Sequence, residues 1–215
     1  MKGGDGVKNR RTKAVLLMTG SLMILQFSLF IIKQIIFLIV ERTNDIDYIA
    51  SMIGMIILSI LFVLFTKKQK VALSVFPERF NQFYILGTCI AAVLFVVTPS
   101  NYSGGFQAIM LLLYGSIVTP IFEELIFRGY IWNRLNDIFE KEWITYIVSA
   151  VLFALWHLGY VDSIAFRMET GLANVMLWKA ITGLCYGVVL GALRLKTKNC
   201  YSTMLLHGVM NIFGR

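Results

Sequence analysis

Apolar residues along this chain gather into long blocks that are separated by short polar segments. A helix needs about 20 mostly apolar residues to cross a bilayer. Seven blocks meet or approach this length, which predicts an all-α fold, a polytopic transmembrane helix bundle of about seven spans. The predicted spans are residues 14–40, 48–66, 80–98, 105–133, 143–160, 172–193 and 200–213.

Two segments need a local interpretation. The first block follows basic residues, as in a signal peptide, but it is too long and lacks a small-residue cleavage site, so we expect a retained span. It contains Lys33, which predicts that the span tilts or ends early. Residues 67–82 mix basic and apolar residues, and we expect a short interfacial helix up to Pro77 rather than a plain loop.

The composition is that of a membrane protein. Apolar residues make up 58% of the 215 residues and charged residues 15%. A soluble fold of this length cannot bury so much apolar surface. The chain has three prolines and no stretch typical of a soluble domain, so residues 1–215 are predicted to form a single integral membrane domain.

The net charge of +8 does not indicate nucleic-acid binding, because the basic residues gather in alternate loops. The remaining loops and the C-terminus hold only Arg42, Arg167 and Arg215. This distribution is the positive-inside pattern. It predicts a multi-pass protein of the cell membrane, surrounded by lipid, with a cytoplasmic N-terminus.

Both histidines and the only adjacent pair of carboxylates lie inside predicted spans. An ionisable side chain costs at least a few kcal/mol at the bilayer centre and is therefore usually functional there. We expect these groups to build one polar site within the bundle. They are Glu123, Glu124, Arg128, His157 and His207.

The carboxylate pair allows two interpretations. On a helix, Glu124 and Arg128 are i, i+4 neighbours and can pair, whereas Glu123 points about 100° away from Glu124. The arginine can therefore neutralise one carboxylate and leave the other free for acid–base chemistry. The alternative is a buried ion pair that only holds the bundle together. Pro120 predicts a kink beside the pair, which could open a small wet cavity.

One stripe of small residues predicts packing rather than chemistry. Gly183, Gly187 and Gly191 recur every four residues and so share one helix face. Small residues in such a stripe let two helices approach closely, and we prefer this interpretation to a hinge.

Three motifs carry a resemblance to a known family, and they occur in its order and spacing. They occupy a motif-bearing core at residues 105–213, whereas the N-terminal third resembles the family only in being hydrophobic. The motifs are Glu123-Glu124-Leu-Ile-Phe-Arg128, Phe153-Ala-Leu-Trp-His157 and His207-Gly-Val-Met-Asn211. They resemble, in this order, the EExxxR, FxxxH and HxxxN motifs of the CPBP family of CAAX proteases and bacteriocin-processing enzymes, also called the Abi family.

The resemblance implies an intramembrane endopeptidase that acts on a small membrane-associated peptide or a lipidated protein. It implies that Glu123 activates the attacking water with help from His157. It also implies that His207 and Asn211 donate hydrogen bonds to the oxyanion. Glu124 and Arg128 would shape and support this site.

The residues allow a mechanism with or without a metal. Glu123, His157 and His207 are an acceptable set for catalytic Zn²⁺, which takes three protein ligands and keeps an open position. However, the chain has no HExxH motif, and a glutamate–water mechanism needs no metal. We expect a reaction without a cofactor, with Zn²⁺ as the alternative.

Two other classes of function compete with the endopeptidase. A non-catalytic membrane scaffold or a bacteriocin self-immunity protein would use the same polar site to bind a partner. A transporter would explain the intramembrane charges, but spans one to three carry few charges and no paired broken helices are evident. Every motif position is retained, which favours the endopeptidase.

Overall fold

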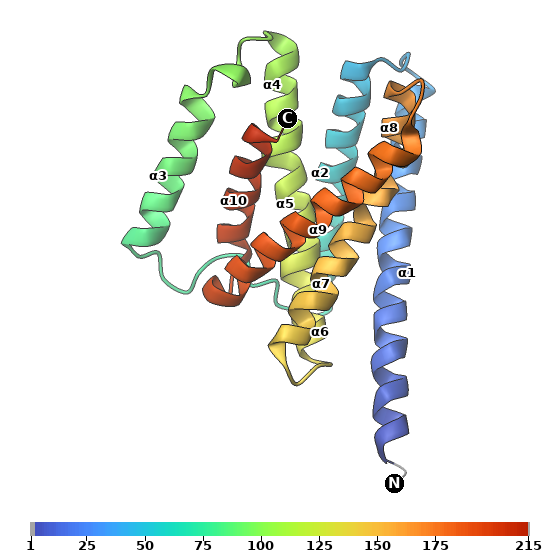
Figure 1. Cartoon of the computed structure of the whole chain (residues 1–215), viewed down its shortest axis with the longest axis vertical. Helices are drawn as coiled ribbons and strands as arrows, with labels where there is room; N and C mark the ends of the chain where they lie inside the picture. The colour runs from blue at the N-terminus through green and yellow to red at the C-terminus, as the bar shows by residue number, and fades with distance from the viewer. Residues whose placement is uncertain (1–2, 215) are drawn as a thin grey trace.

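The computed structural model describes residues 3–214, apart from the side chains of residues 3–8 and 10, and throughout this range the chain is all-α without a strand. The predicted fold class, a helical membrane bundle, is confirmed (Figure 1). Seven helical stretches stand where seven spans were predicted, but only five of them are long and apolar enough to cross a membrane. These five are Arg11–Phe37, Asn44–Lys68, Phe106–Asn136, Glu142–Arg167 and Leu172–Thr197.

Helices α1 (Gly3–Phe37) and α2 (Asn44–Lys68) lie side by side at one edge of the bundle (Figure 1). Thr43 caps α2, since its side chain accepts a hydrogen bond from the Ile46 amide at 3.2 Å. Acidic residues in the first turn of α2 and basic residues in its last turn complement the helix dipole. Helix α1 runs through Lys33, whose side chain is buried against α2 and α8.

Residues 69–81 join α2 to the next helix without any helical turn, so the expected interfacial helix is wrong. The segment is held instead by contacts with parts of the chain that lie far away in sequence. The Cys200 amide donates to the Ser74 carbonyl at 2.9 Å, and the Asn133 side-chain amide donates to the Ala72 carbonyl at 2.7 Å. A mixed basic and apolar pattern does not distinguish such a docked irregular segment from an interfacial helix.

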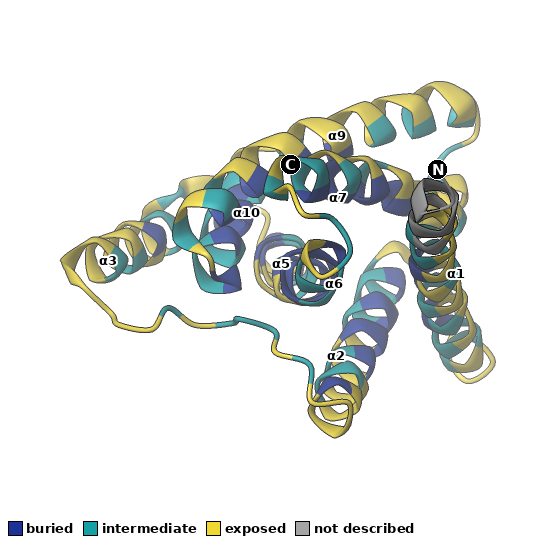
Figure 2. Ribbon diagram, turned by 90° about the horizontal axis from the view of Figure 1, so that it is seen from below, coloured by how far each residue is buried: buried dark blue, intermediate teal, exposed yellow. Residues whose placement is uncertain are grey.

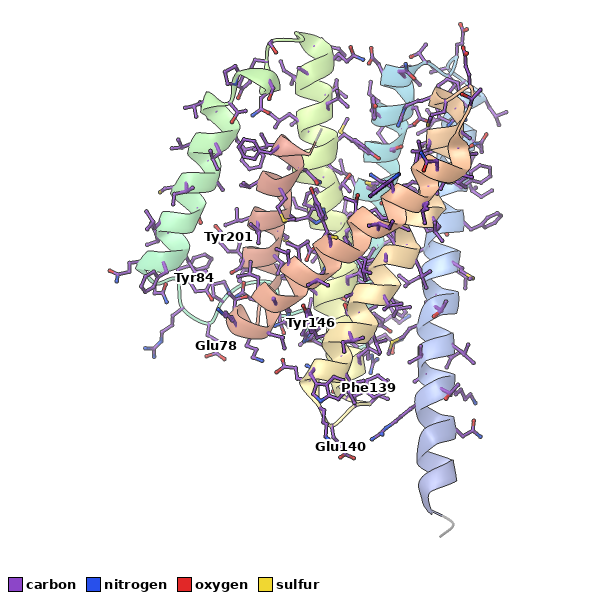
Figure 3. The ribbon with its side chains drawn as sticks, viewed as in Figure 1. Glu78, Tyr84, Phe139, Glu140, Tyr146 and Tyr201 are labelled. Carbon is purple, nitrogen blue, oxygen red and sulfur yellow. The ribbon has the colours of Figure 1, made fainter. Side chains whose placement is uncertain are left out.

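Helices α3 (Gln82–Val97) and α10 (Cys200–Phe213) pack together at the opposite edge (Figure 1). Tyr84 and Tyr201 lie at the end of this pair where residues 69–81 pass (Figure 3). Phe80 packs between them, with ring centroids 6.0 Å from Tyr84 and 5.2 Å from Tyr201. A short 3₁₀ turn, η1 (Pro99–Asn101), then leads into the central part of the chain.

The central stretch of the bundle, residues 106–136, is one continuous helix (Figure 1), and two of its parts are wider π-helical turns. Pro120 lacks an N–H, and in a regular α-helix its ring would clash with the carbonyl group one turn earlier. The π-helical turn η2 (Leu113–Val118) ends just before Pro120. Such π-helical turns are frequent at functional sites, and here they flank the two glutamates. In order, the parts are α4 (Phe106–Leu112), the π-helical η2 (Leu113–Val118), α5 (Thr119–Glu124), the π-helical η3 (Leu125–Ile131) and α6 (Trp132–Asn136).

The last two long stretches cross each other closely. One comprises α7 (Glu142–Trp156), the 3₁₀ turn η4 (His157–Tyr160) and α8 (Val161–Arg167), and the other is α9 (Leu172–Thr197). The predicted close approach at the glycine stripe of α9 is confirmed. A Cβ atom at Gly187 would lie 3.0 Å from the Ala150 Cα atom, and one at Gly191 would lie 2.6 Å from the Tyr146 ring.

Apolar side chains cover the outside of the bundle, whereas dark, buried positions concentrate around α5 and α7 (Figure 2). Monomeric soluble proteins rarely expose contiguous apolar surface of this extent. Lipid tails cover such a surface in a membrane protein. Exposed examples on several helices are Leu16, Ile60, Phe83, Val96 and Trp178.

Candidate active site

Glu123 lies on α5 with its side chain 1% exposed, and its two carboxylate oxygens have different surroundings. Oε1 accepts a hydrogen bond from the Trp156 indole N–H at 2.9 Å and another from the Tyr160 hydroxyl at 2.6 Å. Oε2 is buried and has no hydrogen-bond partner among the residues that the structure describes. The carboxylate is therefore held through one oxygen, and the other is available to a bound molecule.

Glu124 and Arg128 form the expected i, i+4 ion pair, and both side chains are completely buried. An Arg128 guanidinium nitrogen donates to Glu124 Oε1 at 3.0 Å, and a second nitrogen reaches the Gly187 carbonyl of α9 at 3.4 Å. The guanidinium also lies over the Phe153 ring, 4.3 Å from its centroid. This pair joins the central helix to α7 and α9.

His207 of α10 contacts both glutamates. Its Nδ1 atom is 3.0 Å from Glu124 Oε1. A carboxylate oxygen only accepts, so Nδ1 carries a proton. Its Nε2 atom is 3.8 Å from Glu123 Oε2, which is too long for a direct hydrogen bond.

His157 follows the last residue of α7, where the helix narrows to a 3₁₀ turn. Its Nδ1 atom is 2.7 Å from the Phe153 carbonyl oxygen, an acceptor, so Nδ1 is protonated and Nε2 of the neutral ring is an acceptor. Helix α9 packs directly onto the ring, because a Cβ atom at Gly183 would lie 2.7 Å from Nδ1.

Asn211 lies one turn after His207 and is half-buried. Its side-chain amide donates to the Gly115 carbonyl at 2.6 Å, in the wide turn η2. An asparagine amide has two N–H bonds, so one donor is used on the central helix and a second is present.

A cavity of about 430 Å³ joins most of these groups. The site residues that line it are Glu123, His157, His207 and Asn211, together with Tyr160. Glu124 and Arg128 do not line it and lie behind His207 and Phe153. The structure thus brings all six sequence-predicted residues into one neighbourhood, four on the cavity and two behind its wall.

Trp156 and Tyr160 were missed by sequence reasoning, although a signal was present. They lie one residue before and three residues after His157, within an otherwise apolar span. An indole N–H or a phenol hydroxyl buried in a bundle needs a hydrogen-bond partner, just as a histidine does. Applying that rule to this span would have added both residues to the site.

A second polar cluster, the Asp47 cluster, was also missed. Asp47 is completely buried on α2, 3.1 Å from Lys33 Nζ and 2.7 Å from Arg42 Nη2, and it also pairs with Arg167. Burial alone would lower the pKa of Arg42, but hydrogen bonds to Asp162 and Asp47 outweigh it and raise that pKa above its usual value. The cluster consists of Lys33, Arg42, Asp47, Asp162 and Arg167, and it joins α1, α2 and α8.

The proposed zinc ligands Glu123, His157 and His207 all reach the same cavity. Within the described part of the chain, however, no three His, Cys, Asp or Glu side chains are grouped so that they could hold a metal ion. His207 Nδ1 faces Glu124, and one Glu123 oxygen is occupied by Trp156 and Tyr160. The donor atoms therefore do not form a ready zinc site.

Comparison with known proteins identifies the family of this chain. The structure itself defines a polytopic helical membrane protein with glutamates and histidines buried at its centre. The sequence profile described as Type II CAAX prenyl endopeptidase Rce1-like matches residues 105–213, which is half of the chain and contains all three motifs. The chain therefore belongs to the Rce1-like type II CAAX prenyl endopeptidase family, and the predicted resemblance is confirmed.

One curated relative is similar over a shorter region. The chain is 26% identical over 98 residues to the UPF0177 protein YxdF of Lactococcus lactis subsp. lactis (strain IL1403). That match covers 46% of this chain and 44% of the relative. No solved structure matches the chain. Family membership supports intramembrane CAAX-type protease activity in general.

Proposed function

We propose that this protein is an intramembrane endopeptidase that hydrolyses a peptide bond of a small membrane-associated peptide or a lipidated protein. One observation carries the proposal: Glu123 is fixed through Oε1, while its unpartnered Oε2 belongs to a carboxylate on the same cavity as both histidines. Membership in an endopeptidase family supports the reaction type.

The first step is activation of a water molecule. Glu123 Oε2 and Nε2 of neutral His157 are both hydrogen-bond acceptors on the cavity wall. A water molecule that donates one hydrogen to each acceptor would present its oxygen lone pair to a peptide carbonyl. Glu123 takes a proton as the water oxygen attacks, which is general-base catalysis.

The second step is stabilisation of the tetrahedral intermediate and departure of the amine. The remaining N–H of Asn211 and Nε2–H of a protonated His207 are the candidate oxyanion donors. Glu124 accepts from Nδ1 of His207 and would stabilise that imidazolium. Glu123 then delivers its proton to the leaving nitrogen as the C–N bond breaks, so one water is consumed and two peptide ends form.

We further propose a multi-pass protein of the cell membrane with a cytoplasmic N-terminus. Contacts among the basic loops support this orientation. The Cys200 amide donates to the Ser74 carbonyl of the 69–81 segment, and Arg11 pairs with Glu140 just before α7. These contacts gather the basic loops at one end of the bundle. Figure 3 shows Glu140 beside the N-terminal part of α1. Loops rich in Lys and Arg are retained on the cytoplasmic side of a membrane, so this end of the bundle is the one that we place in the cytoplasm.

The test compares a deletion strain complemented with wild type, Glu123→Gln or Glu140→Gln at equal membrane levels. Glu140 is the matched control, since its side chain is 87% exposed and does not line the cavity. Membrane and secreted peptides are compared by mass spectrometry of their termini. We expect a peptide end that appears with wild type and with Glu140→Gln and disappears with Glu123→Gln.

Identical peptide profiles for wild type and Glu123→Gln, with the mutant still restoring the phenotype of the strain, would overturn the endopeptidase. That result would favour the non-catalytic scaffold or bacteriocin self-immunity function. Once a cleaved peptide is known, purified protein treated with a strong chelator distinguishes the two mechanisms. We expect full activity, whereas loss that is restored by Zn²⁺ would favour the metal.

A further inference from the structure

The Trp156 indole and the Tyr160 hydroxyl form a small donor array around one oxygen of Glu123. Both donate to Oε1, at 2.9 Å and 2.6 Å, and the indole nitrogen also lies 3.0 Å from the hydroxyl oxygen. Hydrogen bonds to an ionised carboxylate are shorter and stronger than neutral ones. Two of them on the same oxygen fix both the position and the plane of the carboxylate.

The array selects which oxygen can act on a substrate. With Oε1 occupied twice, the free lone pairs are those of Oε2, which accepts no hydrogen bond from any described residue. Without the array, rotation about the last side-chain bond would exchange the two oxygens. General-base catalysis requires the accepting atom to stay within hydrogen-bond reach of the proton that it removes. Holding Oε1 therefore prepares Oε2 for that work.

Both donors flank His157, the other proposed partner of the water. Trp156 ends α7, and Tyr160 ends the 3₁₀ turn η4 that contains His157. The His157 and Tyr160 rings also meet edge to face, with centroids 6.0 Å apart. A single turn of the chain thus places the histidine and the two groups that hold the glutamate. A shift of this turn would therefore displace His157 and both donors to Glu123 together.

Helix α1 braces this turn from outside the matched family region. The Gln26 side-chain amide donates to the Trp156 backbone carbonyl at 3.1 Å. Gly159 leaves the space that Gln26 occupies, since a Cβ atom there would overlap the glutamine side chain. The family match begins at residue 105, so this contact is contributed by the part of the chain that the match does not cover.

We infer that Trp156 and Tyr160 are positioning residues that hold Oε1 of Glu123, and that Gln26 of α1 fixes the turn that carries them. The inference rests on the proposed endopeptidase function and deepens it. It assigns a role in positioning the site to the first helix, which otherwise resembles the family only in its hydrophobicity.

The test uses purified full-length protein in one detergent and a synthetic internally quenched peptide that spans the cleaved bond found by mass spectrometry. Tyr160→Phe removes only the hydroxyl and keeps the ring. We expect kcat to fall about 10- to 100-fold, the scale of a misplaced catalytic group, with KM changed less than about twofold. Gln26→Leu should lower kcat less than Tyr160→Phe does, again without raising KM.

Tyr146→Phe is the matched control. Its hydroxyl donates to the Val188 carbonyl at 3.0 Å, so the variant also loses one tyrosine hydrogen bond, but away from Glu123. We expect wild-type kcat and KM for this control, and thermal unfolding of each variant is measured in parallel. Equal loss of kcat in both tyrosine variants would overturn the inference, because a general loss of packing would then explain it.

Three other outcomes also count against the inference. Full kcat in Tyr160→Phe would show that the hydroxyl does not position Glu123, while cleavage by wild type would leave the proposed function intact. A raised KM with unchanged kcat would make the hydroxyl a substrate-binding group instead. If wild type and Glu123→Gln produce the same peptide ends, the proposed function fails and the positioning role fails with it.

Discussion

Replacement of Arg128 by methionine should destabilise the bundle more than any other single loss of charge on the central helix. The substitution puts a long apolar side chain in place of the charged one and leaves Glu124 without its counter-ion. The Glu124 and Arg128 side chains are both completely buried. Breaking a buried ion pair by removing one partner costs about 3–5 kcal/mol. Total stabilities of single domains are only about 5–15 kcal/mol, so the loss is a large share.

Contacts around the pair place the expected cost at the upper part of this range. Arg128 Nη1 donates to Glu124 at 3.0 Å, Nη2 reaches the Gly187 carbonyl at 3.4 Å, and the guanidinium lies 4.3 Å from the centroid of the Phe153 ring. All three contacts disappear together in Arg128→Met. His207 still donates to Glu124, which prevents complete loss of partners.

The assay is a double-mutant cycle on purified protein in mixed micelles, with unfolding by a denaturing detergent followed by tryptophan fluorescence. Arg128→Met, Glu124→Gln and the double variant are compared with Arg134→Met. Arg134 is half-buried on α6 and lies over the Tyr130 ring at 5.6 Å, and we expect its loss to cost less than about 1 kcal/mol. The double variant should recover at least about 1 kcal/mol relative to additivity. The buried-pair reasoning would be refuted if Arg128→Met lowered the free energy of unfolding no more than Arg134→Met does, or if the effects of Arg128→Met and Glu124→Gln were strictly additive.

Two further substitutions test the packing of the site and its support. Gly183→Ala places a methyl group against the His157 ring, so we expect activity to fall about tenfold or more. Gly87→Ala is the control, because nothing lies within 4 Å of its added methyl group, and its activity should stay at the wild-type level. Equal activities of the two variants in a cleavage assay would contradict this. Asp47→Asn removes the carboxylate shared by three cations of the Asp47 cluster, and we expect about 3–5 kcal/mol of destabilisation in the same unfolding assay. The exposed control Glu41→Gln should cost almost nothing. Similar unfolding curves for the two variants would show that the cluster does not hold α1.

Most of the fold could be predicted from the sequence, because the rule that governs it is local. Backbone groups in a bilayer must be satisfied within their own segment, so each apolar block becomes a helix. All seven predicted blocks are helical. The lengths were less certain: α3 (Gln82–Val97) and α10 (Cys200–Phe213) are too short to qualify as full spans. The 69–81 segment was mispredicted because its partners on α6 and α10 lie far away in sequence.

The candidate site divides in the same way. The i, i+4 spacing of Glu124 and Arg128 was sufficient to predict their ion pair, which the structure contains. The spacing could not predict that Glu124 would face His207 or that Glu123 would be held by Trp156 and Tyr160. Those contacts join separate helices, and their geometry depends on how the helices cross.

The membrane helices, the three motifs and the costly polar groups inside apolar spans could all be identified without the structure, since hydrophobicity and helical periodicity act over a few turns. The packing of the helices was needed to show which oxygen of Glu123 is free, which residues line the cavity and how α1 supports the turn at His157. These features arise where side chains from α1, α5, α7, α9 and α10 meet. Their positions depend on packing between helices, including the close approach at Gly183.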